Sequence, residues 1–112
     1  MKIDARHAGE VMVLDLYGKL TIGEGDVRLR GELLDQLEEG HRKLLINLKN
    51  VKTIDSSGLG ELIRCKATAA SRGAQVKLVN VNLGIYKLLT MSQLIGVFEM
   101  FDDEEKAIAS FS

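Results

Sequence analysis

The sequence has few aromatic residues, no tryptophan and almost no net charge. Its formal net charge is -1 at pH 7, and aromatic residues make up 4% of the chain. A chain with such balanced charge has no electrostatic attraction for phosphate backbones or for anionic lipid. Aromatic platforms on which single-stranded nucleic acid could stack are also scarce. We therefore expect that the protein does not bind nucleic acid.

Cysteine is nearly absent too, because Cys65 is the only one. A single cysteine cannot form an internal disulfide, and no Cys/His cluster has the spacing of a metal site, so we expect no metal and no cofactor. No stretch approaches the roughly 20 apolar residues that a membrane span needs. The segment Met1–His7 lacks the apolar run of a signal peptide. These absences predict a cytoplasmic protein that does not insert directly into a membrane.

The length and composition are those of one globular domain. The 112 residues suffice for one ordinary domain and are too few for two. Hydrophobic residues make up 46% of the chain and charged residues 28%, which is typical of a folded protein and not of a disordered one. No repeat, linker or low-complexity segment divides the sequence. We therefore predict a single domain over residues 1–112.

Hydrophobic periodicity predicts strands that alternate with helices. Residues 12–17 have the period of a half-buried strand, and Gly18 marks the expected turn after it. The nearly continuous apolar run 44–48 is typical of a central strand covered on both faces. Together these elements predict an α/β domain with a largely parallel sheet. The other predicted elements are helices over 27–39, 57–71, 83–91 and 103–111 and strands over 76–81 and 97–101.

The first predicted helix has signals at both of its ends. Asp26 is a plausible N-cap, and Gly40 suits the C-terminal stop. The spacing of its apolar residues places them on one helical face, which we expect to be buried. These residues are Val27, Leu33, Leu34 and Leu37.

The segment Thr53–Leu62 is the most informative part of the sequence, because a strand ends there and a helix begins. Junctions of this kind often carry function in α/β folds. Asp55, Ser56 and Ser57 place two hydroxyls beside a carboxylate. The free N–H groups at the start of a helix tolerate the charge of a phosphate. A simpler interpretation also stands, in which Asp55 or Ser56 only caps the helix and the glycines only permit close packing.

Catalysis by this segment is not expected. A serine nucleophile needs an adjacent base, and nothing ties the only histidines, His7 and His41, to Ser56. No Gly-Lys-Ser/Thr sequence follows the segment, so P-loop nucleotide binding has no support. We therefore predict no catalytic residue and a protein that is not an enzyme.

The segment Asp55–Gly60, which follows Asn47–Leu48 and the apolar Val51 and Ile54, resembles the signature of the STAS family. That family is named for sulphate transporters and anti-sigma factor antagonists. The stretch Leu88–Leu94 is similar to the family's third-helix pattern of an apolar pair, Met-Ser and Leu. The resemblance covers essentially the whole chain. It implies a single STAS domain with a mixed sheet of four or five strands, flanked by about four helices.

The resemblance also implies the function of an anti-sigma factor antagonist. In stand-alone members the serine directly after the Asp, here Ser56, is the phosphorylation site. The unphosphorylated form would bind an anti-sigma factor, which is also its serine kinase, and so release a sigma factor. Phosphorylation would end the binding, and a PP2C-type phosphatase would restore it. The residues predicted to contact the partner are Asp55, Ser56, Ser57, Gly58, Leu59 and Gly60.

Other functions within the same family stay open. The chain could be a STAS scaffold in a signalling complex that never cycles through phosphate. It could also be the small cytoplasmic subunit of a lipid-transport system. The sequence leaves a weak homodimer open as well.

Several residues around the signature have their own interpretations. Gly18–Thr21 reads Gly-Lys-Leu-Thr where many antagonists carry a Gly-Glu-Leu-Asp type segment, so both acidic positions are replaced. Leu59 is either a core residue or an exposed apolar bump that a partner covers. Glu61 lies within about two helical turns of Ser56 and would add negative charge there. Cys65 falls on the buried side of its helix, where a core thiol is expected.

Overall fold

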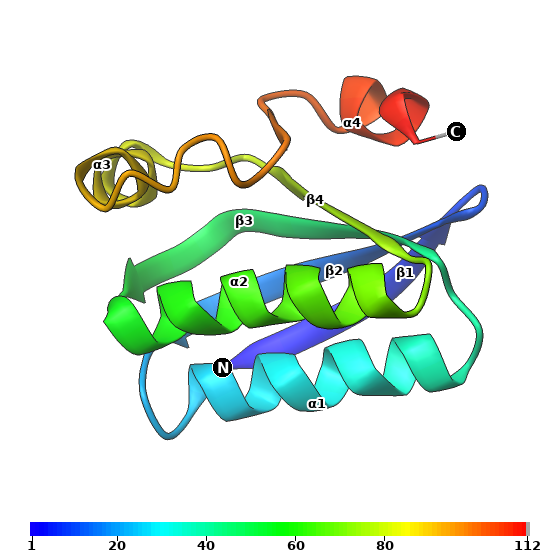
Figure 1. Ribbon diagram of the computed structural model, residues 1–112, viewed down its shortest axis with the longest axis horizontal. Helices are drawn as coiled ribbons and strands as arrows, with labels where there is room; N and C mark the ends of the chain where they lie inside the picture. The colour runs from blue at the N-terminus through cyan, green and yellow to red at the C-terminus, as the bar shows by residue number, and fades with distance from the viewer. Residues whose placement is uncertain (112) are drawn as a thin grey trace.

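A computed structural model of the chain describes residues 1–111, which form five strands and four helices. The strands form one sheet in the order β1-β2-β3-β4-β5 (Figure 1). β1 runs antiparallel to β2, and all other neighbouring strands are parallel. This confirms the predicted mixed sheet with four helices. The elements are β1 (Lys2–Ala8), β2 (Val11–Leu20), α1 (Gly25–Glu38), β3 (Lys43–Ile54), α2 (Ser56–Ser71), β4 (Gln75–Val79), α3 (Leu83–Met91), β5 (Met100–Phe101) and α4 (Glu104–Ser110).

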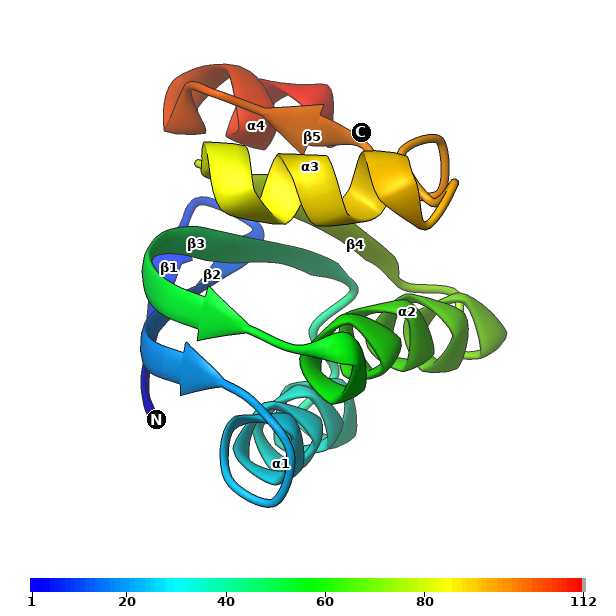
Figure 2. The same cartoon turned by 90° about the vertical axis from the view of Figure 1, so that its left-hand side faces the viewer.

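Helices cover both faces of the sheet. On one face α1, α2 and α3 pack over a core that includes Leu14 and Ile46, and on the other face α4 packs through Ala107. Figure 2 shows α1 and α4 at opposite ends of the molecule, with the sheet between them. β3 contributes to both cores, because Ile46 belongs to the first and its neighbour Leu45 to the second. The prediction that the run 44–48 is covered on both faces is therefore confirmed.

The sequence patterns missed β1 and the full length of β2. β1 lies at the edge of the sheet, where Ile3 is buried and most of its other residues are exposed, so it lacks a hydrophobic pattern. Gly18 was expected to mark a turn, but β2 continues through it to Leu20. Parallel pairing with β3 extends as far as Leu20, and Gly18 adopts a positive φ of 110° beside an irregularity in that pairing.

The predicted start of α1 was wrong. The helix begins at Gly25, and Asp26 is not its N-cap but lies in its first turn. Val27 was expected on the buried face but is 56% exposed, whereas Leu29 is fully buried. Gly25, the first residue of the helix, packs against the end of β2, where an added Cβ would lie 2.2 Å from the backbone oxygen of Lys19. The expected stop was confirmed, because Gly40 follows the helix with a positive φ of 94°.

The second half of the chain follows the predicted order with shorter strands. The helix predicted over 83–91 is found at Leu83–Met91. β4 ends at Val79 because Asn80 adopts a left-handed conformation with φ of 59°. The last strand was expected over 97–101 but comprises only Met100–Phe101. Within residues 1–111, none of the helices is long and apolar enough to cross a membrane.

Candidate functional site at the start of α2

Asp55 caps α2 and joins it to the loop that follows β2. Its carboxylate accepts a hydrogen bond from the backbone N–H of Gly58 at 2.8 Å and another from the N–H of Ile22 at 3.1 Å. These two N–H groups hold the pKa of Asp55 below its usual value. Asp55 is therefore a fixed negative charge, and it carries the cap role that the sequence left open between Asp55 and Ser56.

Ser56 is the first residue of α2 and is exposed. Within residues 1–111 its hydroxyl makes no hydrogen bond, because Asp55 satisfies the helix start. Ser57, the next residue, is half-buried. The hydroxyl of Ser56 is thus free to react with another protein, at the positive end of the α2 dipole.

The two glycines of the signature have different surroundings. Gly58 lies against the end of β2, and a Cβ there would be 2.0 Å from the backbone oxygen of Leu20. A Cβ on Gly60 would meet nothing within 4 Å. Leu59 is 5% exposed and belongs to the main core, so it is not an exposed bump. Among the six predicted partner-contact residues, the side chain of Leu59 is therefore unavailable in this conformation, and the contact role of the other five stays a prediction.

Glu61 does not add free charge beside Ser56, contrary to the sequence-based expectation. Its side chain is 1% exposed and accepts hydrogen bonds from Arg30 at 2.6 and 3.0 Å and from Arg64 at 3.3 Å. The Cys65 thiol lies 3.6 Å from the same carboxylate. Cys65 is 1% exposed and belongs to the main core, which confirms a core thiol, and burial, followed by the charge of Glu61, raises its pKa. The sequence signal for this cluster was weak, since Glu61 and Arg30 are far apart in the chain.

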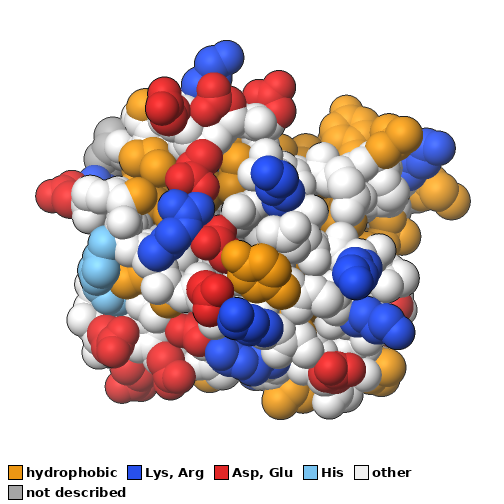
Figure 3. Space-filling view, turned by 180° about the vertical axis from the view of Figure 1, so that it is seen from behind, with side chains coloured by type: hydrophobic (Ala, Val, Ile, Leu, Met, Phe, Trp, Pro, Cys, Tyr) orange, Lys and Arg blue, Asp and Glu red, His pale blue; other side chains and the backbone are white. Residues whose placement is uncertain are grey.

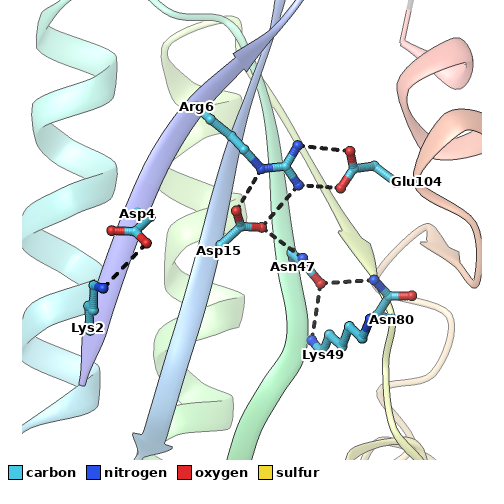
Figure 4. Close-up of polar contacts among 8 residues, drawn as sticks. All are labelled: Lys2, Asp4, Arg6, Asp15, Asn47, Lys49, Asn80 and Glu104. Atoms are coloured by element: carbon cyan, nitrogen blue, oxygen red, sulfur yellow. Dashed lines mark hydrogen bonds and ion pairs between the residues drawn. The ribbon is translucent and has the colours of Figure 1, made fainter.

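A second polar cluster crosses the strands away from Ser56 (Figure 4). Arg6 on β1 contacts both Asp15 on β2 and Glu104 on α4. Asp15 accepts a hydrogen bond from Asn47 at 2.8 Å, and Asn47 accepts one from Asn80 at 3.0 Å. Burial would raise the pKa of Asp15, but the hydrogen bonds from Arg6 and Asn47 hold it below its usual value. This cluster links β1, β2, β3, the residue after β4 and α4, and it was not predicted from the sequence.

The histidines lie at the other end of the sheet from Ser56. His7 is at the end of β1, and His41 precedes β3, whose opposite end leads into Ser56. Their rings meet edge to face with centroids 5.3 Å apart. The geometry therefore places no histidine base beside the serine. In the part of the chain that the structure describes, no group of three or more His, Cys, Asp or Glu side chains gathers around a metal-sized site.

A family profile and the sequences of known proteins point to the same family. The profile of the STAS domain matches residues 2–107. The anti-sigma F factor antagonist of Paenibacillus polymyxa is 28% identical over 110 residues, which cover 96% of this chain and 92% of that protein. Its sequence match therefore extends over nearly the full length of both proteins.

Solved structures agree in fold. The Bacillus cell-fate determinant SpoIIAA in its phosphorylated form has a TM-score of 0.75 at 21% identity, covering 99% of this chain and 100% of that one. A candidate anti-sigma factor antagonist from Thermotoga maritima has a TM-score of 0.86 at 23% identity, covering 96% and 92% of the two chains.

These relatives also bear on the prediction that the chain is not an enzyme. Anti-sigma factor antagonists are regulatory proteins without enzymatic activity, in agreement with that prediction. The match to the family profile spans the strands, the first three helices and the signature at the start of α2. This chain therefore belongs to the STAS domain family, and its homologues over nearly the whole chain include anti-sigma factor antagonists.

Proposed function

We propose that this protein is an anti-sigma factor antagonist that is switched by phosphorylation of Ser56. The unphosphorylated form binds an anti-sigma factor, which is also its serine kinase, and thereby releases a sigma factor. A PP2C-type phosphatase removes the phosphate, and the cycle takes place in the cytoplasm. The observation that carries the proposal is the free, exposed hydroxyl of Ser56, because Asp55 performs the capping that would otherwise occupy it.

The electrostatics of the helix start support a switch at this residue. A phosphate adds about -1.5 to -2 charges at neutral pH, and the N-terminus of α2 tolerates that charge in the free protein. Asp55, directly before it, is already ionised. A partner that packs closely over Ser56 would have to bury both charges, and burial of unpaired charge is costly. Phosphorylation can therefore end binding without any change in the fold.

The test uses purified anti-sigma factor kinases from the organism that supplies this chain. We expect one of them to phosphorylate Ser56, as located by tandem mass spectrometry, and to bind Ser56→Ala. Protein with phosphoserine at position 56 should bind at least tenfold more weakly, a difference of about 1.4 kcal/mol. Ser57→Ala is the matched control and should still be phosphorylated. Because Ser56 does not cap α2, Ser56→Ala should unfold at nearly the wild-type urea concentration.

Two outcomes would contradict the proposal. One is phosphate on Ser57 in place of Ser56. The other is equal affinity of the kinase for Ser56→Ala and for the phosphoserine form, which would favour a STAS scaffold that does not cycle through phosphate.

A further inference from the structure

Lys19 lies at the carboxyl end of β2 and Lys52 near that of β3, a few residues before Ser56, whereas Lys49 lies near the middle of β3. Lys19, Lys49 and Lys52 are all exposed, and within residues 1–111 none of them forms an ion pair. The strand pairing places Lys19 opposite Thr53, only a few residues before Ser56. Lys49 and Lys52 line one surface hollow of about 530 Å³. These lysines form no ion pairs within the described residues, although positive and negative residues are nearly balanced over the whole chain, whose net charge is -1.

The acidic residues nearby make their hydrogen bonds with groups other than these lysines, and the charge of Lys19 acts on Glu24 without a direct ion pair. Glu24 in the loop after β2 is paired with the amino group of Met1 at 3.0 Å. The carboxylate of Asp55 is directed at two backbone N–H groups. Asp26 uses one carboxylate oxygen to accept a hydrogen bond from the N–H of Val27 at 2.7 Å.

Two exposed apolar side chains follow Lys19 in the chain. Ile22 is 72% exposed, and its backbone N–H is bound to Asp55, so the chain holds it next to Ser56. Val27, 56% exposed, follows in the first turn of α1. On the right of Figure 3, Lys and Arg side chains lie between apolar groups above and below. An exposed branched aliphatic side chain bordered by charge is a common anchor in protein interfaces.

We propose that Ile22, Lys19 and Lys52 form the docking surface for the anti-sigma factor, and that the segment which docks there is acidic and carries an apolar side chain. This inference rests on the proposed function. Ile22 inserts into the partner, while the lysines attract acidic side chains and orient the encounter. A phosphate on Ser56 then offsets much of the lysine charge and repels the acidic segment.

The experiment uses the kinase that phosphorylates Ser56 and measures its affinity for variants at low and at high salt. The variants are the double charge reversal Lys19→Glu/Lys52→Glu and the single change Ile22→Ser. Their matched controls are Lys106→Glu on α4 and Met91→Ser, since Lys106 is exposed and Met91 is 82% exposed at the far end of α3. All five substituted positions are exposed, so urea unfolding should show wild-type stability within a small margin.

We expect the charge reversal to weaken binding at least tenfold at low salt. It should also reduce the dependence of the affinity on salt concentration, because exposed charges are screened by salt. Ile22→Ser should weaken binding at least tenfold at both salt concentrations. The controls should bind within twofold of wild type. Wild-type affinity and salt dependence of the charge-reversal variant would overturn the inference, as would wild-type affinity of Ile22→Ser.

The results also separate this inference from the proposed function. If phosphorylation of Ser56 ends binding but the surface variants bind like wild type, only the docking surface is wrong. If no anti-sigma factor kinase acts on Ser56, the proposed function and the docking surface both fail.

Discussion

Replacement of Gly58 by alanine should destabilise the protein, whereas the same change at Gly60 should not. Both glycines lie near the start of α2, but only Gly58 contacts the end of β2. An added Cβ at Gly58 would lie 2.0 Å from the backbone oxygen of Leu20 and 2.9 Å from its carbonyl carbon and its Cγ. At Gly60 the added Cβ would point into open space. The pair thus isolates one close contact between α2 and β2.

Two opposing contributions set the size of the effect. Alanine is favoured over glycine in a helix by about 1 kcal/mol, so Gly60→Ala should stabilise the protein by up to that amount. At Gly58 the methyl group forces α2 away from Leu20, and overpacking of this kind costs about 1–3 kcal/mol or somewhat more. Because the closest atom belongs to the backbone and cannot rotate away, we expect the upper part of that range. Gly58→Ala should therefore lose about 2 kcal/mol after the helix contribution is included.

Urea unfolding followed by far-UV circular dichroism measures both variants. For a domain of this size the free energy of unfolding falls by about 1–3 kcal/mol per molar urea. A difference of about 3 kcal/mol between the variants would therefore separate their midpoints by about 1–3 M urea. Equal midpoints, or a Gly58→Ala midpoint at or above that of wild type, would refute the close packing of Gly58 against Leu20.

Two further predictions concern ionisable groups. Hydrogen bonds hold the folded pKa of Asp15 below its usual value, so its stabilising contribution is present above the unfolded pKa of about 3.9 and is lost as pH falls through the folded pKa. The stability of Asp15→Asn should therefore fall less than that of wild type below about pH 4, and an equal loss in urea midpoint would contradict this. Burial raises the pKa of the Cys65 thiol, so a thiol reagent at neutral pH should label the native protein slowly and the urea-unfolded protein at once. Rapid labelling of native protein would show that Cys65 is accessible.

Much of the fold follows from local patterns in the sequence. The helix over 83–91 was predicted at the residues where it is found, and in the structure Asn82 caps it by accepting a hydrogen bond from the N–H of Ile85. The run 44–48 predicted a strand buried on both faces, since a nearly continuous apolar run is typical of such a strand. Each of these signals lies within a few residues of the element that it predicts.

The patterns failed where neighbours that are distant in the sequence decide the structure. β1 has one buried apolar residue, Ile3, and is a strand because it pairs with β2 along its full length. α1 begins at Gly25, where the backbone of Lys19 approaches too closely for any larger residue. Local capping preference pointed to Asp26 instead, and the tertiary contact outweighed it.

At the candidate site, the sequence by itself determined that Asp55, Ser56 and the glycines lie where a strand ends and a helix begins. The hydrophobic periodicity on either side of the segment predicts that junction. Only the tertiary structure decided how these residues divide their roles. The Asp55 carboxylate accepts hydrogen bonds from the N–H of Gly58 and from the N–H of Ile22 in the loop after β2. The Ser56 hydroxyl is therefore not needed as a cap. The end of β2 packs against Gly58, and Arg30 on α1 forms an ion pair with Glu61. Contacts between segments so far apart in the chain have no local signature, because they depend on how the packed helices and strands meet.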